Sequence, residues 1–194
     1  MEEQELISSS RAGDIEAFNL LVEQYQRLVY NLALRMLGNS ETAEDVTQDA
    51  FLSAYRAIGK FRGGSFKSWI LRIAANSCRD KMRVARRARV TSLDTLLEKS
   101  GDLLLDNNAE SPEDYVLRRE LGQFLNEGLT HLPEDQRLAV VLCDIQGLSY
   151  EEVSQATGSS LGTVKSRLNR GRARLRDFLL QRRELLPAEF RQDK

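Results

Sequence analysis

The spacing of apolar residues limits this chain to one class of fold. Almost every periodic segment repeats its apolar residues at the helical interval, and no segment alternates convincingly as a strand would. Only three prolines interrupt the 194 residues. The periodicity predicts an all-α fold with helices at roughly 14–37, 41–59, 66–86, 113–130, 134–146, 149–157 and 160–183, separated by glycine-containing turns.

One stretch departs from this periodicity. Residues 90–112 contain Ser, Asp, Asn, Gly and a Pro in place of a regular apolar repeat. We interpret this stretch as a flexible linker between two small helical domains, 1–89 and 113–183, followed by a short tail, 184–194.

Charge is segregated along the chain, although the net charge is only −1. Residues 1–50 carry ten acids and three bases, whereas residues 79–89 carry six bases and one acid. A second basic segment, 160–183, carries eight bases and one acid. Two basic patches on an otherwise acidic chain favour two contact points on a polyanion.

Other chemistry is disfavoured by composition. The acidic start, MEEQELISSS, has no apolar segment typical of a signal peptide, and no apolar run is long enough to span a bilayer. We therefore expect a cytoplasmic protein without membrane insertion. Cys78 and Cys143 lie far apart and are expected to be reduced and buried. His131 is the single histidine and stands at a predicted helix boundary, so we expect a turn or cap role and no metal site, cofactor or catalytic residue.

The C-terminal segment has the pattern of a helix-turn-helix. Ser149 and Glu152 have the spacing of a capping box, which predicts the start of a short helix. Gly158 ends that helix, and Ser159 or Ser160 can cap the next one. Two helices of this length joined by a tight glycine turn are typical of DNA-binding proteins.

The second helix of this pair has two distinct faces. Its apolar stripe, expected to pack inward, comprises Leu161, Val164, Leu168, Gly171, Leu175, Phe178 and Leu179. Its opposite face comprises Lys165, Ser166, Asn169, Arg170 and Arg176. Lys and Arg can read guanine edges, Asn can read adenine, and the remaining bases can hold phosphates. A merely solvated basic helix is the alternative, but solvated faces usually mix both signs of charge.

The predicted helix 41–59 also has two faces. One face is apolar, and the other carries Glu41, Glu44, Asp45, Gln48 and Asp49 with Leu52 among them. An acidic face with an exposed leucine fits a protein partner that offers basic side chains and a small apolar socket. The pattern alone is equally compatible with plain solvation.

A glycine loop with aromatic residues precedes the helix at 66–86. Ser65 is expected to cap that helix, whose residues Arg72, Asn76, Arg79 and Arg83 form one stripe. Rings that stack on bases, beside cations that hold the backbone, are the elements of single-strand nucleic-acid binding. Phe66 and Trp69 fall on the apolar arc and are expected in the core, which leaves Phe61 as the ring that can touch a base.

Together these segments resemble the extracytoplasmic-function class of sigma factors, which direct bacterial RNA polymerase to promoters. Three blocks carry the resemblance, in the family's order and spacing: 43–58, 61–80 and 132–175. The resemblance implies contacts with core RNA polymerase, at the coiled coil of its largest subunit and at its flap, and an anti-sigma factor as regulator. It places the coiled-coil contact on Asp45, Gln48, Asp49 and Leu52.

The resemblance also assigns roles in promoter DNA binding. It implies that the melted minus-ten strand meets Phe61, Gly63, Gly64, Ser65, Ile73 and Asn76, with Arg79 and Arg83 on the backbone. It implies that the duplex minus-thirty-five element meets Ser160, Thr163, Lys165, Ser166, Asn169 and Arg170. The chain departs from the family pattern at Gly64, Ser154, Ser160 and Asn169, so its minus-thirty-five preference is expected to differ.

Two other functions fit parts of the sequence. A stand-alone helix-turn-helix regulator would explain the C-terminal pattern, but neither the acidic helix nor the aromatic loop. A nucleic-acid-processing enzyme would need metal ligands, for which Glu44, Asp45 and Asp49 are the candidates. These acids are spread along one helix face with no second acid cluster nearby, so no enzymatic activity is expected.

Overall fold

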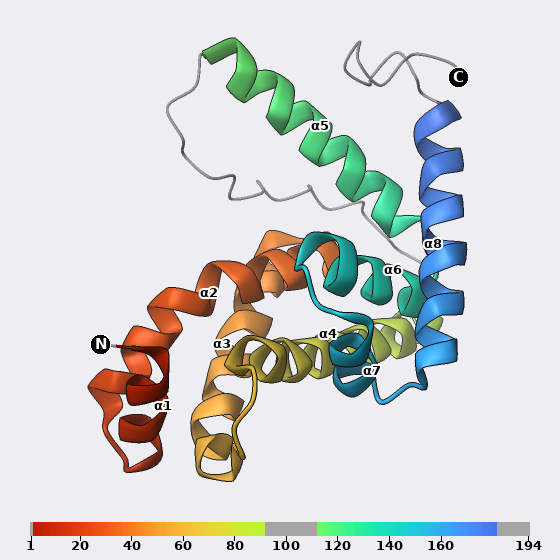
Figure 1. The fold of residues 1–194 in the computed structure, drawn as a ribbon. Coiled ribbons are helices and arrows are strands. Elements are labelled where there is room, and N and C mark those ends of the chain that lie inside the picture. Colours follow the sequence, from red (N-terminus) through yellow and green to blue (C-terminus); the bar gives the residue numbers. More distant parts are fainter. Residues whose placement is uncertain (1, 92–111, 182–194) are drawn as a thin grey trace.

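The computed structural model describes residues 2–91 and 112–181, which form helices and no strand (Figure 1). Residues 92–111 of the predicted linker and the predicted tail, 184–194, lie outside this described part. The helices are α1 (Glu3–Arg11), α2 (Ile15–Leu37), α3 (Ser40–Ala57), α4 (Phe66–Thr91), α5 (Pro112–Thr130), α6 (Glu134–Val140), α7 (Tyr150–Thr157) and α8 (Leu161–Gln181). A 3₁₀ turn, Ile58–Lys60, follows α3, and a π turn, Val141–Ile145, follows α6. The predicted all-α fold is confirmed.

Short polar side chains and glycine set the ends of the early helices. Asp14 caps α2 by accepting a hydrogen bond from the amide of Ala17, and Asn39 caps α3 by accepting one from Thr42. Between them, Gly38 ends α2 with a φ of 75°, a left-handed conformation that favours glycine. The chain therefore reverses between α2 and α3 within two residues.

Helices α2, α3 and α4 enclose the N-terminal part of the core. Its largest fully buried side chains include Leu21, Leu32, Leu34, Phe66, Ile70 and Leu71. Helix α1, which the sequence analysis did not predict, packs on α2 and buries Leu6 and Ile7. The hydroxyl of Tyr25 on α2 donates a hydrogen bond to Glu3, and burial with this bond raises the pKa of Tyr25.

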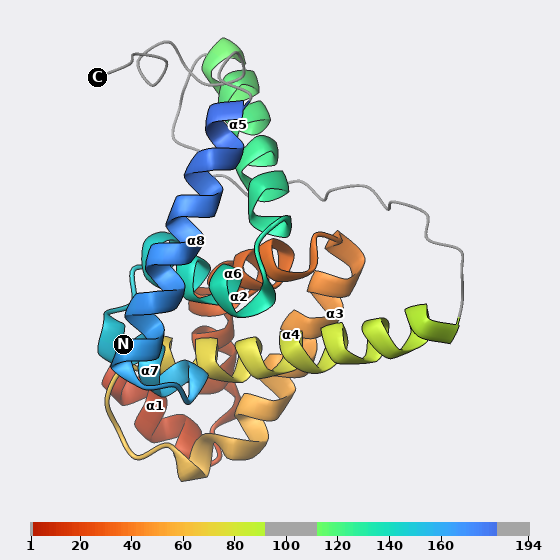
Figure 2. The ribbon, with the colours of Figure 1, turned by 90° about the vertical axis from the view of Figure 1, so that its right-hand side faces the viewer.

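In the C-terminal part, α8 crosses α6 and pairs with α5 (Figure 2). The crossing with α6 is close because Gly171 has no side chain: a Cβ there would lie 2.8 Å from Val140 Cγ2 and 3.3 Å from the carbonyl oxygen of Gln136. Gly128 of α5 faces Leu175 and Phe178 of α8 in the same way. Small residues thus set both helix spacings around α8.

The π turn adds one residue between α6 and the helix-turn-helix. The amide of Gln146 donates to the carbonyl of Val141 at 2.9 Å, five residues back, where an α-helix would bond four residues back. The predicted helix over 134–146 is therefore present, but its second half is wound as a π turn. The apolar run Val140–Val141–Leu142 is buried throughout, so the hydrophobic pattern could not reveal the change in winding.

The two predicted domains pack against each other in this structure. Buried residues from α1 to α8 form one continuous hydrophobic cluster, and α7 lies on α4 (Figure 1). Arg137 of α6 donates to the carbonyl of Met36 at the end of α2 at 2.6 Å, and Gln146 donates to the carbonyl of Leu28 at 3.4 Å.

The cysteines differ from their predicted environment. Both thiols are free, and burial raises the pKa of Cys78 to about 12. Cys143, on the π turn, is only half-buried, so the expectation of two buried cysteines holds for Cys78 alone. Among the described helices, none has the length and apolar character needed to cross a bilayer.

Candidate nucleic-acid and polymerase interfaces

The outer face of α3 presents the acidic surface that the sequence predicts. Asp45, Gln48 and Asp49 are exposed, and Leu52 keeps 55% of its surface accessible. The opposite face is closed off by fully buried Ala43, Val46, Ala50 and Ala54. Small alanines let α3 lie close to its neighbours, so the four outward side chains are held on a rigid support. We name Asp45, Gln48, Asp49 and Leu52 the α3 acidic face.

The glycine loop before α4 is exposed at its tip. Gly63 and Gly64 have φ angles of 92° and 91°, which side-chain-bearing residues rarely adopt. Ser65 caps α4 by accepting a hydrogen bond from the amide of Ser68 at 3.1 Å, as predicted. Gly63, Gly64 and Ser65 are therefore accessible to a ligand.

The ring of Phe61 is in the core, contrary to the expectation that it can touch a base. It is 4% exposed and packs against Phe66 and Trp69, with ring centroids 5.9 and 5.2 Å apart. The 3₁₀ turn ahead of it directs the ring inward, which the loop position in the sequence did not indicate. Phe66 is fully buried as predicted, whereas Trp69 remains half-exposed.

The predicted stripe on α4 is largely accessible. Arg72, Asn76 and Arg83 are exposed, and Ile73 is half-buried beside them. Arg83 pairs with Asp80 at 2.5 Å on the same helix. Arg79 differs, because its side chain is 25% exposed and faces Asp135 of α6 at 3.8 Å.

The helix-turn-helix has the predicted local chemistry. Ser149 and Glu152 form both hydrogen bonds of the capping box at the start of α7. Gly158 ends α7 with a φ of 64°, and the Ser154 hydroxyl donates to the carbonyl of Ser159 across the turn. Ser160 caps α8 by accepting from the amide of Thr163 at 3.2 Å. The turn before α8 is thus held by the hydroxyls of Ser154 and Ser160.

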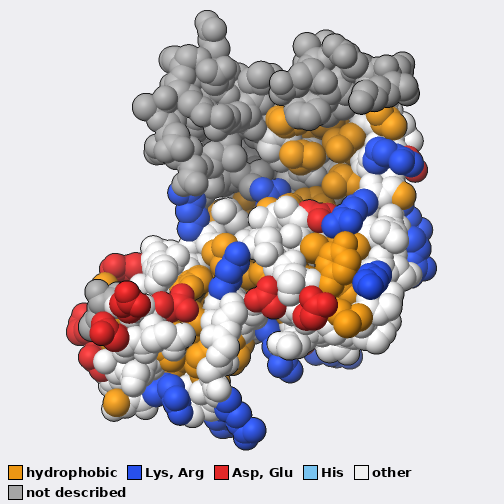
Figure 3. Space-filling view, in the orientation of Figure 1, with side chains coloured by type: hydrophobic (Ala, Val, Ile, Leu, Met, Phe, Trp, Pro, Cys, Tyr) orange, Lys and Arg blue, Asp and Glu red, His pale blue; other side chains and the backbone are white. Residues whose placement is uncertain are grey.

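The outward face of α8 is exposed in the described part of the chain. Lys165, Ser166, Asn169 and Arg170 are exposed, and Arg170 hydrogen-bonds to Ser166 one turn earlier. Val164, Leu168 and Gly171 are buried on the opposite side. Leu161 was expected in that buried stripe but is 41% exposed, because α8 begins there, before the crossing with α6. In Figure 3, basic side chains gather along the edge formed by α8, and acidic ones gather over α1 and α2.

Two arginines of α8 serve the protein's own structure, which sequence reasoning missed. Arg167 donates to Ser159 at 2.7 Å and to Asp135 at 2.6 Å, so it ties the turn to α6. Arg172 binds Asp144 of the π turn at 2.6 and 2.9 Å, and these bonds raise its pKa. Arg172 follows Lys165 by seven residues and so lies on the same side of α8, which means that its pairing with Asp144 could not be read from the helical spacing.

The described residues include no group of three or more His, Cys, Asp or Glu side chains that could hold a metal ion. His131 contacts the carbonyl of Glu127 through its Nδ1 at 2.9 Å and lies beside the ring of Phe178. It therefore closes the end of α5, in keeping with the predicted turn role.

Two models of known protein families match this chain. Residues 21–88 match the model of sigma-70 region 2, and residues 125–175 match that of sigma-70 region 4. The region 2 segment contains the α3 acidic face and the α4 stripe. The region 4 segment contains the helix-turn-helix.

Individual relatives narrow the assignment within the sigma-70 family. The chain is 39% identical over 176 residues to the RNA polymerase sigma-H factor of Pseudomonas aeruginosa, covering 88% of this chain and 90% of that protein. It is 38% identical, with the same coverage, to the ECF RNA polymerase sigma-E factor of Escherichia coli. The chain belongs to the extracytoplasmic-function sigma factors of the sigma-70 family.

Solved structures of sigma factors share the arrangement of helices. The sigma factor RpoE of Bartonella quintana, in complex with the anti-sigma factor NepR, matches with a TM-score of 0.69 at 26% identity, over 85% of this chain and 98% of that one. CnrH, in complex with the cytosolic domain of CnrY, matches with a TM-score of 0.64 at 27% identity, over 91% and 96%.

Proposed function

We propose that this sigma factor attaches to core RNA polymerase through the α3 acidic face. The observation that carries this proposal is the exposure of three polar residues and one leucine on a rigid, alanine-packed helix. Carboxylates there attract basic side chains, and Leu52 can fill a small apolar socket at the centre of the contact. The coiled coil of the largest polymerase subunit is the proposed partner, and the flap is proposed to contact the C-terminal helices.

The loop and α4 are proposed to bind the opened minus-ten strand. Gly63, Gly64 and Ser65 form an accessible loop that leads into α4, which carries Ile73 and Asn76, and Arg83 supplies positive charge for the backbone. Unstacking a base costs a few kcal/mol, which contacts in such a pocket can offset. Since Phe61 is buried, the half-exposed Trp69 replaces it in this proposal as the ring nearest the surface.

The outward face of α8 is proposed to enter the major groove of the minus-thirty-five element. Lys165, Asn169 and Arg170 can reach base edges, while Ser160, Thr163 and Ser166 lie near the helix start, where backbone amides favour phosphate. Arg167 and Arg172 are engaged with the protein itself and hold the helix in place.

The proposed activity involves no bond making or breaking by this chain, so the protein acts as a non-enzymatic, cytoplasmic partner of polymerase. Regulation by an anti-sigma factor is supported by the two similar structures, whose sigma factors are bound to NepR and to CnrY. We propose the domain limits 1–89 and 113–183 for the two halves, which include the matched regions.

Charge reversal on α3 tests the anchor. We expect Asp45→Arg to abolish binding to core polymerase and run-off transcription, because it brings like charges together at the contact. Asp45 is exposed and, within the described part of the chain, its ion pair is with Lys81 at 3.4 Å, so the circular dichroism spectrum and melting temperature should change little. Glu16→Arg, the same charge change at an exposed position of α2, serves as the control and should bind normally.

Normal polymerase binding by a folded Asp45→Arg variant would show that the anchor lies elsewhere. Specific, tight binding of duplex DNA by the isolated chain would favour the stand-alone regulator instead. Run-off transcription with core polymerase on a library of promoters identifies the start sites. The polymerase-binding test and the duplex-binding test then use DNA from these promoters.

A further inference from the structure

We propose that Ser166 is a positioning residue for minus-thirty-five recognition, which holds the guanidinium of Arg170 so that one of its edges is presented to a guanine. The inference rests on the proposed function, because it takes the outward face of α8 as the surface that meets the duplex element. It adds an assignment within that surface: Arg170 contacts the base, and Ser166 acts through Arg170.

Ser166 lies at the centre of the outward face of α8. It is two residues from Val164 and two from Leu168, both buried, so it points about 160° away from each of them around the helix. Its exposed neighbours are the longer side chains of Asn169 and Arg170. A serine at this position is short enough for Arg170, one turn later, to lie across it.

Two hydrogen bonds fix the guanidinium of Arg170 on Ser166. The Nη2 of Arg170 donates to the Ser166 hydroxyl at 2.7 Å, and its Nε donates to the Ser166 carbonyl oxygen at 3.3 Å. Both donors lie on the same edge of the planar guanidinium. The bonds draw the side chain toward the start of α8, the end at which recognition helices contact base edges.

These hydrogen bonds leave the other edge of the guanidinium available. A guanidinium has five N–H groups, and Ser166 accepts from the one on Nε and from one of the two on Nη2. Within the described part of the chain, both N–H groups on Nη1 and the second on Nη2 remain without an acceptor. One N–H from each of these nitrogens points the same way, and this pair matches the O6 and N7 acceptors of guanine.

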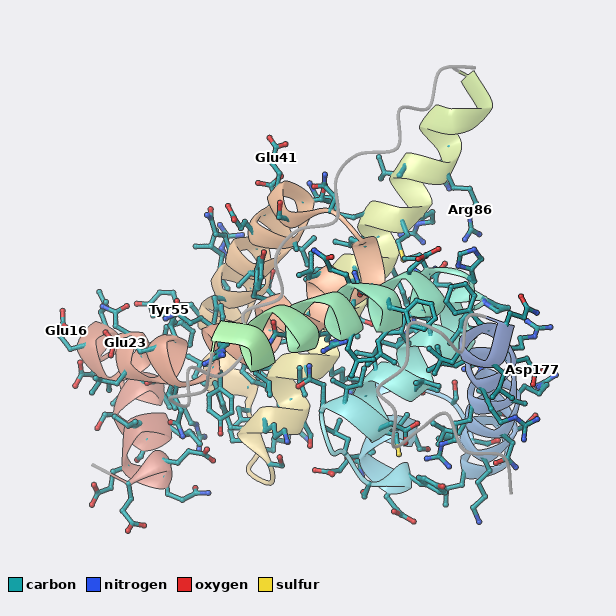
Figure 4. The ribbon with its side chains drawn as sticks, turned by 90° about the horizontal axis from the view of Figure 1, so that it is seen from above. Glu16, Glu23, Glu41, Tyr55, Arg86 and Asp177 are labelled. Atoms are coloured by element: carbon teal, nitrogen blue, oxygen red, sulfur yellow. The ribbon has the colours of Figure 1, made fainter. Side chains whose placement is uncertain are left out.

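Arg170 differs from other arginines of α8 in how its charge is balanced. Arg167, Arg172 and Arg176 each pair with an aspartate, at 2.6, 2.6 and 3.3 Å. Arg170 is held by neutral oxygens, and among the described residues no carboxylate pairs with it. The acidic side chains of α2, such as Glu16, lie at the opposite end of the molecule from α8 (Figure 4). Arg170 is therefore oriented while its positive charge remains available to DNA.

Orientation of this kind increases selectivity more than affinity. An arginine on a freely rotating stem can meet a phosphate or another base, whereas a fixed edge fits the paired acceptors of guanine best. A side chain that is already held also loses less conformational freedom on binding. Loss of the Ser166 hydroxyl should therefore lower the preference for guanine more than it lowers overall binding.

The base preference of the polymerase holoenzyme tests this assignment. We would combine core polymerase with the full-length chain and measure binding to a selected promoter and to its single-base variants in the minus-thirty-five element. One guanine is expected to be preferred over adenine about tenfold or more by the wild type but not by Arg170→Ala, which identifies it as the base that Arg170 contacts. Absence of such a guanine would overturn the proposal.

Removal and restoration of the hydroxyl then test Ser166. Ser166→Ala is expected to reduce the preference at this guanine about three- to tenfold, because the guanidinium edge is no longer fixed. Ser166→Thr keeps a hydroxyl and should retain the preference. Arg174→Ala is the matched control, because it removes an exposed arginine of the same helix and should leave the preference at this guanine unchanged.

A double-mutant cycle separates positioning from direct contact with DNA. If Ser166 acts through Arg170, Ser166→Ala changes the preference for guanine no further once Arg170 is replaced by alanine. An equal loss in both backgrounds would contradict the proposal, because Ser166 would then contact the DNA itself.

The orientation of Arg170 can also be measured without DNA or polymerase. NMR relaxation of the arginine Nε–H groups in the free, full-length chain is expected to show Arg170 more restricted than Arg174, and the two equally mobile in Ser166→Ala. Equal mobility of the two arginines in the wild type would rule out the role of Ser166.

Failure of the proposed function is distinguishable from failure of this inference. If the wild-type chain directs polymerase to no start site, the proposed function is wrong and this inference falls with it. If start sites are found but Ser166→Ala keeps the full preference for guanine, only the role of Ser166 is wrong.

Discussion

At the scale of single residues, glycine decides how closely α8 can approach its neighbours. Gly171 lies at the crossing with α6, and Gly162 lies nine residues earlier in the first turn of the same helix. A Cβ at position 171 would come within 2.8 Å of Val140 and 3.3 Å of a backbone oxygen, whereas one at position 162 would meet only the Ser160 hydroxyl at 4.0 Å. The two glycines therefore respond oppositely to the same substitution.

We expect Gly171→Ala to lower the free energy of unfolding by about 1–3 kcal/mol, because backbone oxygen cannot move aside as a flexible side chain can. Gly162→Ala is the control and should be neutral or stabilising by up to about 1 kcal/mol, since alanine favours helix. Chemical denaturation followed by circular dichroism measures both. A Gly171→Ala variant as stable as Gly162→Ala would show that α6 and α8 separate easily.

At the scale of elements, the carboxylate of Glu152 makes two hydrogen bonds that hold α7. Glu152 accepts hydrogen bonds from Ser68 of α4 and from the amide of Ser149, and these bonds lower its pKa from the ordinary 4.5. A carboxylate whose folded pKa is depressed stabilises the fold above its unfolded pKa. That contribution is lost as the pH falls through the folded value.

We therefore expect Glu152→Gln to flatten the acid limb of the stability profile. Between pH 7 and pH values below about 4, the wild-type chain should lose more stability than the variant, as measured by urea denaturation at each pH. Glu151→Gln removes the neighbouring exposed carboxylate and should retain the wild-type slope. Identical slopes for wild type and Glu152→Gln would contradict the assigned hydrogen bonds.

The elements that sequence predicted well are those with strong local signals. The positions of α2 to α4 and of the helix-turn-helix could be predicted from long amphipathic segments and from the caps at Ser65 and Ser149. Capping and periodicity act within a few residues, so the sequence shows them directly. Helix α1 was missed because it is short and contains a run of three serines. It is stabilised by packing of Leu6 and Ile7 on α2, which no local pattern shows.

The candidate site was predictable where exposure follows from helical periodicity. The outward residues of α3 and α8 lie where the wheel places them. Phe61 was misplaced because a loop position does not determine which way a ring points. Arg79 and Arg167 share Asp135 through contacts between α4, α6 and α8, and such tertiary pairings are invisible to a single helix wheel.

At the scale of the whole molecule, one buried guanidinium connects the two halves. Arg137 is 9% exposed and donates to the carbonyls of Met36, Thr130 and Leu132 at 2.6, 2.6 and 3.3 Å. Burial lowers its pKa, although Glu134 acts in the opposite direction. Its position beside the last turn of α2 places positive charge where helix carbonyls lack partners.

We expect Arg137→Ala to destabilise the chain by about 1–3 kcal/mol, because buried carbonyls lose their donors. Arg137→Lys keeps the charge without the forked geometry and should fall between alanine and wild type. Arg174→Ala, at an exposed position of α8, is the control and should unfold as the wild type does. Thermal unfolding that is unchanged in Arg137→Ala would rule out this connection.

The π turn has a consequence for how the C-terminal half can vary. Each residue of an α-helix advances the chain by about 100°, so removing one residue from Val141–Ile145 would restore ordinary winding and swing every following segment by about that angle. Asp144 would then point away from Arg172, and the outward face of α8 would be turned toward a different side of the DNA. The number of residues in this turn therefore sets the direction in which α8 faces.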